Sequence, residues 1–201
     1  FETIVVVGSD SFLASWVEKN YDWVTIENCS SFYGPGGARN KGLKVAKGRY
    51  YAFIDGDCIP ENDWLQHLIT ACSDNGGLPV KGWIETSKPN SAWHRAEIYA
   101  QEGRARPCRK VVTYGLSGAN MCVSRPYLGE SSSPFEEGIY GAEEQTVFCG
   151  KWGRQKKVIL EPKARVTHLE STEFTDSFGR ALRMGRGSGY IRRSGKLRGS
   201  G

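Results

Sequence analysis

The 201-residue sequence contains no apolar stretch long enough to span a membrane and no signal-peptide pattern. It also contains no C-x-x-C pair, although it has six cysteines. These absences argue against a disulfide framework and a zinc site, and we expect reduced, mostly buried thiols in a cytoplasmic protein. No internal repeat is present, and the length suits one domain with a full core.

Acidic residues are absent from residues 180–201, which carry seven Lys or Arg. This segment has a formal charge of +7, whereas residues 1–179 sum to −2. We therefore separate a domain over residues 1–179 from a basic C-terminal helix or tail. Two explanations fit this charge equally. One is a solvated basic face, and the other is contact with anionic lipid or a phosphate-bearing ligand. Nucleic acid is disfavoured, because only Tyr190 interleaves the basic residues.

Short apolar runs alternate with helical patterns along the chain. The runs that predict strands are residues 3–7, 24–26, 50–54, 78–84, 121–123, 157–160 and 165–168. The helical patterns cover residues 11–20, 38–46, 64–72, 91–101, 143–152 and 174–192. This alternation with short connections predicts an α/β fold, with a mostly parallel sheet and helices on both of its faces.

Two carboxylates, Asp55 and Asp57, follow the predicted strand over residues 50–54, with Gly56 between them. Glycine permits a bend that would turn both carboxylates towards one pocket. Two hard oxygen ligands at the carboxyl edge of a strand suit Mg²⁺ or Mn²⁺, which in turn suits a diphosphate. Taken alone, such a triplet is more often a solvated turn.

A glycine-rich loop over residues 34–37 precedes Arg39 and Asn40. Glycines let backbone amides approach a ligand, and a helix that starts at Ala38 would favour an anion at its N-terminus. Arg39 could donate two hydrogen bonds to a phosphate or a base edge. By itself the segment is an ordinary helix start.

Further motifs extend this pattern over about residues 3–168. In chain order the motifs are A-R-N-x-G at 38–42, A-x-G at 46–48, D-G-D at 55–57, W-L at 64–65, G-A-N at 118–120, F-E-E at 135–137, G-A-E-E at 141–144 and P-x-x-x-V-x-H at 162–168. Together they resemble the inverting glycosyltransferases of family 2. The resemblance implies the GT-A (nucleotide-diphospho-sugar transferase) fold, a single Rossmann-like sheet. It also implies metal-dependent transfer of a sugar from a nucleotide-diphosphate donor to an acceptor hydroxyl.

The resemblance also implies roles in metal binding. Asp57 would be a direct ligand of Mg²⁺ or Mn²⁺, and Asp55 would lie near the ribose or just outside the metal's ligands. His168 would be a third ligand or a diphosphate contact, although a lone histidine at a strand end is as often structural. The cation would neutralise charge as the sugar–phosphate bond breaks.

The donor-binding residues implied by the resemblance are Asp10, Arg39, Asn40, Asp55, Asp57 and Gly118. The family's first strand has no counterpart here, and residues 1–10 resemble its second strand. Asp10 then stands nearest to the aspartate that contacts the base in relatives. Because Phe1 is not a start methionine, we expect an N-terminally truncated fragment whose nucleotide pocket is open on one side.

Glu144, with Glu143 beside it, occupies the place of the family's catalytic aspartate. A carboxylate at a helix N-terminus can accept the proton of the acceptor hydroxyl. The alternative is that Glu143 and Glu144 only interact favourably with the helix dipole. Glutamate moves the carboxylate by about 1 Å relative to aspartate, which is enough to lower a rate.

Other functions are compatible with parts of the pattern. A nucleotidyltransferase would carry a lysine in a glycine-rich loop directly after its first strand, and a D-x-D phosphatase would leave Arg39 and Glu144 unexplained. A non-catalytic sugar- or nucleotide-binding relative of the same fold stays open. The acceptor can be a glycan, a lipid-linked or a small molecule. The basic tail favours a membrane-surface acceptor in polysaccharide or glycolipid assembly, with peripheral contact at the inner face of the membrane.

Overall fold

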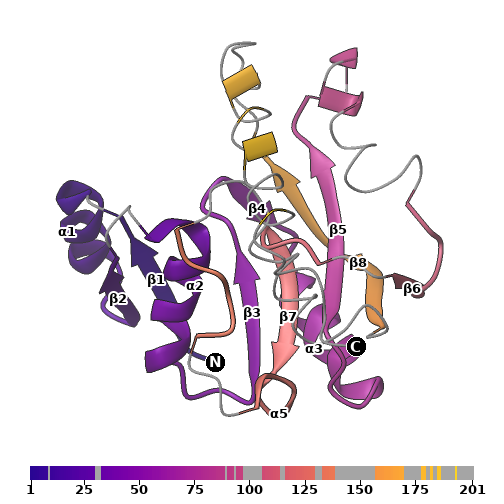
Figure 1. Ribbon diagram of the computed structural model, residues 1–201, viewed down its shortest axis with the longest axis horizontal. Coiled ribbons are helices and arrows are strands. Elements are labelled where there is room, and N and C mark those ends of the chain that lie inside the picture. The colour runs from indigo at the N-terminus through magenta and orange to yellow at the C-terminus, as the bar shows by residue number, and fades with distance from the viewer. Residues whose placement is uncertain are drawn as a thin grey trace.

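The computed structural model describes most of the chain up to Leu169. The described residues are 1–8, 10–29, 33–88, 90–92, 94–96, 106–113, 116–129, 133–138 and 157–169, with 178, 179, 182, 185, 186 and 193 as isolated positions. Helices lie against two sheets, which confirms the α/β fold (Figure 1). One sheet has two strands and the other has six.

The two-stranded sheet is built from the N-terminal β-α-β segment. β1 (Thr3–Val7) pairs in parallel with β2 (Val24–Asn28), and α1 (Ser11–Asn20) connects them. These bounds match the predicted ones except that β2 runs two residues further. Asp10 caps α1, because its Oδ1 accepts a hydrogen bond of 3.0 Å from the Leu13 N–H.

The six-stranded sheet has the order β3-β7-β5-β8-β4, and β6 also pairs with β8. Its strands are β3 (Tyr50–Ile54), β4 (Cys58–Pro60), β5 (Val80–Thr86), β6 (Val111–Thr113), β7 (Asn120–Ser124) and β8 (Val158–His168). Of its described pairs, β5 with β8 is parallel and the others are antiparallel. The predicted mostly parallel sheet is therefore wrong, because the β-α-β alternation that favours parallel pairing does not continue beyond β5.

Two helices and one long strand refine the predicted elements, and the structure adds one short helix that the sequence did not predict. The helices are α2 (Gly34–Val45), α3 (Trp64–Asp74) and the short α5 (Arg125–Leu128). The predicted loop over residues 34–37 is instead the first turn of α2, where the missing N–H of Pro35 is not needed. A single strand, β8, replaces the two strands predicted around Pro162. The strand stays paired with β5 because the register shifts: Gly82 pairs with Glu161 and the next residue, Trp83, pairs with Arg165, so the part of β8 around Pro162 bulges out of the ladder.

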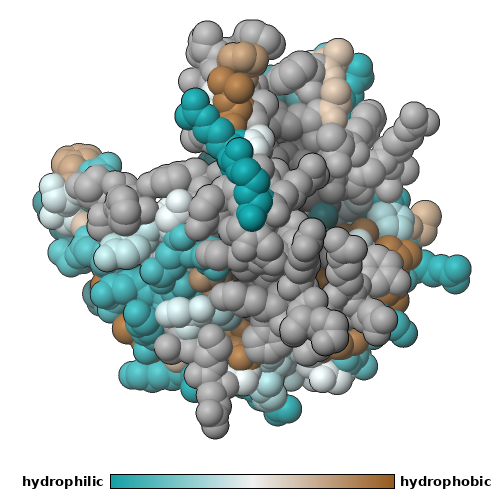
Figure 2. All heavy atoms as spheres, in the orientation of Figure 1, coloured by the Kyte–Doolittle hydropathy of each residue, from teal (hydrophilic) through white to brown (hydrophobic). Residues whose placement is uncertain are grey.

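The core lies on both faces of the six-stranded sheet. On one face α3 buries Trp64, Leu68, Ala71 and Cys72, which recur at helical spacing. A second cluster contains Met121, Val123, Leu128 and Phe135. Hydrophilic side chains cover most of the described surface over α2 and the β1–β2 sheet, at the left of Figure 2.

Five cysteines lie in the described part of the chain, and none of them forms a disulfide there. Cys72 and Cys122 are buried, Cys29 and Cys58 are half-buried, and Cys108 is exposed. The prediction of mostly buried thiols is therefore wrong for the described cysteines. No helix among the described residues is both long and apolar enough to cross a membrane. The predicted helix over residues 143–152 lies outside the described residues, as do most of those over 91–101 and 174–192.

Candidate functional site

The D-G-D triplet forms the tight turn between β3 and β4. The Cys58 N–H donates a hydrogen bond of 3.1 Å to the Asp55 carbonyl oxygen, which closes the turn. Gly56 is not among the described glycines with a left-handed φ, and a Cβ added to it would meet no atom within 4 Å. The bend therefore does not depend on glycine, because the turn has a conformation open to other residues.

Asp57, Cys58 and His168 gather at the start of β4 and the end of β8. His168 Nε2 lies 3.4 Å from Asp57 Oδ2, and Cys58 Sγ lies 4.0 Å from Asp57 Oδ1. The ligand atoms of all three residues lie within 4.8 Å of one another. Within the described ranges, this is the one group of three or more His, Cys, Asp or Glu that could hold a metal ion. Its nitrogen, sulfur and oxygen donors fit a divalent cation.

The pairing of β4 with β8 explains why this group forms. Cys58 and His168 are direct partners in the antiparallel ladder, and the Leu169 N–H donates to the Asp57 carbonyl oxygen at 2.7 Å. The side chain of His168 is only 16% exposed, whereas that of Asp57 is 57% exposed. The imidazole is thus held against the sheet while the carboxylate reaches solvent.

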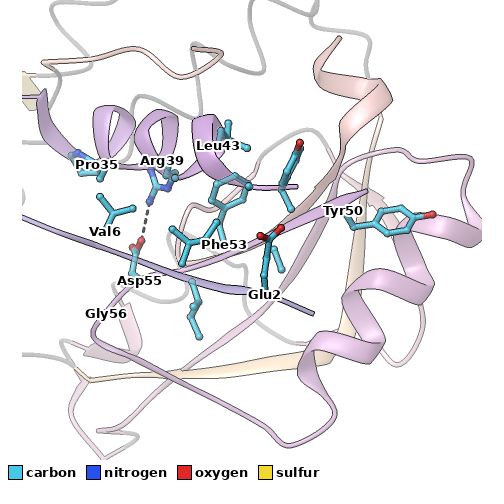
Figure 3. Close-up of a pocket in the computed structure, with 16 residues that line it drawn as sticks. Glu2, Val6, Pro35, Arg39, Leu43, Tyr50, Phe53, Asp55 and Gly56 are labelled. Carbon is cyan, nitrogen blue, oxygen red and sulfur yellow. Dashed lines mark hydrogen bonds and ion pairs between the residues drawn. The ribbon is translucent and has the colours of Figure 1, made fainter. Parts of the chain in front are cut away.

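Asp55 points elsewhere, to Arg39 on α2. Arg39 Nη2 lies 2.9 Å from Asp55 Oδ1, and their side chains are 8% and 43% exposed (Figure 3). Asp55 is not in the group formed by Asp57, Cys58 and His168. The structure therefore brings Asp57 and His168 together as predicted, but it does not place Asp55 with them as a metal ligand.

The Arg39–Asp55 pair lines a cavity of about 310 Å³ between β1, α2 and β3. Ile4, Val6 and Leu43 contribute to its apolar walls. In Figure 3 the ion pair lies beside Val6. Glu2, which precedes β1, lies nearer to the Tyr50 end of β3. No ladder joins β1 to β3 among the described residues. That the family's first strand has no counterpart in this chain stays a prediction.

Glu2 lines the cavity near the start of β3. Its Oε1 accepts hydrogen bonds from the Lys47 N–H at 2.7 Å and the Gly48 N–H at 2.8 Å. These two backbone donors hold the pKa of the Glu2 carboxyl below its usual range. The interaction ties the start of β1 to the connection between α2 and β3.

Asn40 does not face a ligand, because its side chain is buried and fully engaged. Its Nδ2 donates to the Phe135 carbonyl oxygen and to Glu137 Oε1, both at 2.9 Å. Its Oδ1 accepts from the Phe135 N–H at 3.0 Å, and the residue is 1% exposed. The structure places Asn40 as a clamp between α2 and the loop over residues 133–138, not as the predicted donor ligand.

Phe135 extends this clamp towards the ion pair. Its ring packs edge-to-face on Phe53 with centroids 5.5 Å apart, and the Arg39 guanidinium lies 5.9 Å from its centroid. A loop side chain therefore helps to fix Arg39, whose own exposure is small. The F-E-E motif pointed to this loop in the sequence, but it did not indicate that the loop packs against Arg39 and Asn40.

The other predicted site residues are less informative. Asp10 is occupied as the cap of α1, and Gly118 is buried in the turn before β7. Glu143 and Glu144 lie outside the described residues, so the assignment of the base stays a prediction. Most of the basic tail also lies outside them, and its membrane contact stays a prediction.

Comparisons with known proteins agree with this geometry. The family model described as Glycosyl transferase family 2 matches residues 5–130. The chain is 40% identical over 53 residues to glycosyltransferase AglE of Haloferax volcanii, a match that covers 26% of this chain and 17% of that protein. It is 23% identical over 155 residues to a putative polypeptide N-acetylgalactosaminyltransferase 13 of Drosophila melanogaster, covering 66% and 27% of the two chains. The chain thus matches only about a quarter or less of these relatives' lengths.

Two solved structures share the fold. One is GalNAc-T7 with UDP, GalNAc and Mn²⁺, with a TM-score of 0.60 and 13% identity over 86% of this chain and 38% of that chain. The other is S. aureus TarS 1-349, with a TM-score of 0.60 and 20% identity over 84% and 51%. At these identities the likeness establishes the fold alone, and it agrees with the predicted GT-A architecture.

Proposed function

The chain belongs to glycosyl transferase family 2, and we propose that it is a metal-dependent, inverting glycosyltransferase. Its donor would be a nucleotide-diphosphate sugar and its acceptor the hydroxyl of a glycan, a lipid-linked or a small molecule. The observation that carries the proposal is the group of Asp57 and His168 at a strand edge, next to the Arg39–Asp55 pair. The GalNAc-T7 structure, which holds UDP and Mn²⁺, supports this type of donor and cation.

Asp57 and His168 would hold the divalent cation, Mg²⁺ or Mn²⁺. When bound there, such a cation supplies a Lewis acid for the charge of the departing nucleotide diphosphate. The 57% exposed Asp57 carboxylate can reach a ligand that arrives from solvent, and the half-buried imidazole lies against the sheet. The two residues thus offer one exposed and one largely shielded donor atom.

Asp55 would contact the donor, and Arg39 would hold Asp55 in position. The carboxylate is 43% exposed and the guanidinium side chain only 8%, so the carboxylate is the more accessible partner. A carboxylate accepts hydrogen bonds from hydroxyl groups such as those of ribose. This division of roles replaces the expectation that Arg39 itself binds a phosphate.

Glu144, with Glu143 beside it, remains our proposed base for the acceptor hydroxyl. The support is its sequence position after the F-E-E loop, which Asn40 clamps to α2. A base must lie within hydrogen-bond reach of the proton that it accepts. The clamp would limit how far the following segment can move from the donor site.

The first test is donor hydrolysis and sugar transfer by the protein with Mn²⁺, measured for the wild type and for Asp57→Asn. We expect the substitution to lower kcat/KM at least about 100-fold, because it removes a charged group that acts where charge develops. Thermal unfolding followed by circular dichroism checks that the variant is folded.

Asp63→Asn is the matched control, since Asp63 Oδ2 also pairs with a histidine, His67 Nε2, at 3.0 Å. We expect this variant to keep nearly the wild-type rate. Equal losses in both variants would contradict the assigned role of Asp57. An inactive wild type that still binds sugar nucleotides would favour a non-catalytic binding protein.

A further inference from the structure

We propose that Cys58 is a third protein ligand of the cation, beside Asp57 and His168. The site would then favour a cation that accepts a thiolate, such as Zn²⁺ or Co²⁺, more than a site of oxygen and nitrogen donors alone would. This inference deepens the proposed function, on whose metal site it rests. The D-G-D triplet did not indicate it, because a thiol is not among the hard ligands that such a motif suggests.

The backbone places Cys58 in this position. Cys58 and His168 are direct partners across the antiparallel ladder of β4 and β8. Directly opposite residues project to the same face of a sheet, with their Cβ atoms about 5 Å apart. The hydrogen bond of 2.7 Å from the Leu169 N–H to the Asp57 carbonyl oxygen continues this register by one residue. The relation of Cys58 to His168 therefore follows from strand pairing and does not depend on rotamers alone.

The distances between the donor atoms come close to those of a tetrahedral site. Bonds of about 2.0–2.3 Å at tetrahedral angles separate ligand atoms by roughly 3.3–3.8 Å. His168 Nε2 lies 3.4 Å from Asp57 Oδ2, and Cys58 Sγ lies 4.0 Å from the other oxygen of that carboxylate, Asp57 Oδ1. The ligand atoms of the three residues all lie within 4.8 Å of one another. The Asp57 side chain is exposed enough to adjust by a few tenths of an ångström. Three protein donors leave the fourth position for an oxygen of a ligand, as in catalytic zinc sites.

A purely structural role for Cys58 is the competing explanation. Its side chain is half-buried and packs against the core cluster that contains Trp64 and Leu68. As a small hydrophobic residue, it would affect stability but not cation binding. As a ligand, its thiol would release a proton to the solvent and bind the cation as thiolate. The two explanations differ in spectroscopic and selectivity measurements.

The decisive measurement is a titration of the protein with Co²⁺ in the absence of any donor. A sulfur ligand gives a thiolate-to-cobalt charge-transfer band in the near ultraviolet. We expect the band in the wild type, its loss in Cys58→Ser, and its retention in Cys108→Ser, which removes the exposed thiol. A band that persists in Cys58→Ser, or a wild type that binds Co²⁺ without the band, would overturn the proposal.

Cation selectivity provides a second readout. Zn²⁺ binds most protein sites more tightly than Mn²⁺, so the informative quantity is the change in the ratio of the two affinities. We expect Cys58→Ser to lower the Zn²⁺/Mn²⁺ affinity ratio at least about tenfold. Cys58→Asp, which supplies a hard ligand, should restore Mn²⁺ affinity without the charge-transfer band. An unchanged ratio in a folded Cys58→Ser variant would overturn the proposal.

These outcomes separate the ligand assignment from the proposed function. A wild type with the cobalt–thiolate band but without sugar transfer would keep Cys58 as a ligand and contradict the glycosyltransferase. A wild type that transfers sugar with Mn²⁺ but lacks the band would support the glycosyltransferase and contradict Cys58 as a ligand. Circular dichroism of each variant shows whether a lost band reflects unfolding, and Cys58→Ala repeats the test if the serine variant is unstable.

Discussion

Asn120 is a buried polar residue of β7 that joins three other segments of the described core. Its Nδ2 donates to the carbonyl oxygens of Trp83 at 3.0 Å and Ala164 at 2.9 Å, and its Oδ1 accepts from Trp64 Nε1 at 2.8 Å. The residue is completely buried. Its side chain also lies where a Cβ on Gly82 would be, which explains the glycine at that position of β5.

Asn120→Ala should lower the free energy of unfolding by about 3 kcal/mol, because it removes three buried hydrogen bonds, to Trp64, Trp83 and Ala164. Urea unfolding of the protein gives this value. Asn20→Ala is the control, since Asn20 makes an exposed hydrogen bond of 2.7 Å to the Trp16 carbonyl oxygen. Its change should stay within about 0.5 kcal/mol. Similar losses in the two variants would refute the role of Asn120.

Among the elements, α2 connects two separate parts of the site. It carries Arg39, which fixes Asp55 at the end of β3, and Asn40, which fixes Phe135 in the loop over residues 133–138. One helix turn therefore holds both the end of the D-G-D strand and the loop that precedes the proposed base. Because Arg39 and Asn40 are consecutive residues of a helix, their side chains point in different directions. Arg39 points to the cavity, and Asn40 points to the loop over residues 133–138.

Asn40→Ala should release the loop from α2. The Phe135 N–H, which donates to Asn40 Oδ1, should then exchange with solvent at least about tenfold faster, since its protecting acceptor is gone. Hydrogen exchange followed by NMR measures this rate. In Glu137→Ala only the exposed partner of Asn40 is removed, so the Phe135 amide should stay protected. Equal protection in wild type and Asn40→Ala would show that other contacts hold the loop.

At the scale of the whole molecule, the two sheets differ in how much they bury. The buried apolar residues of β1 and α1 are Val7, Ala14 and Val17, whereas the two core clusters belong to the six-stranded sheet and its helices. The cavity of about 310 Å³ lies between β1 and β3. Fewer buried apolar contacts imply a lower free energy of local opening.

Amides of β1 and β2 should therefore open with a free energy at least about 2 kcal/mol below that of amides in β5, β7 and β8. Native-state hydrogen exchange at low denaturant concentrations measures both sets in one sample. The paired amides of the β1–β2 ladder are the right probes, because they are hydrogen-bonded in the folded state. Identical opening free energies would mean that the two sheets unfold as one unit.

Local sequence patterns correctly predicted those strands and helices that depend mainly on neighbouring residues. The apolar runs over residues 3–7 and 50–54 and the helical pattern over 11–20 match β1, β3 and α1, since strand and helix periodicity depend on near neighbours. The resemblance also selected Asp57 and His168, because both stand in recognisable motifs. The family assignment followed from the same motifs.

Which of these segments meet, and in which direction, follows from contacts between distant parts of the chain. The antiparallel pairing of β4 with β8 places Cys58 opposite His168, and the packing of α2 on the loop buries Asn40. Asp55 and Asp57 are two residues apart, yet one pairs with α2 and the other faces β8. Contacts between residues far apart in the chain depend on strand register and packing, and no local periodicity encodes either of these.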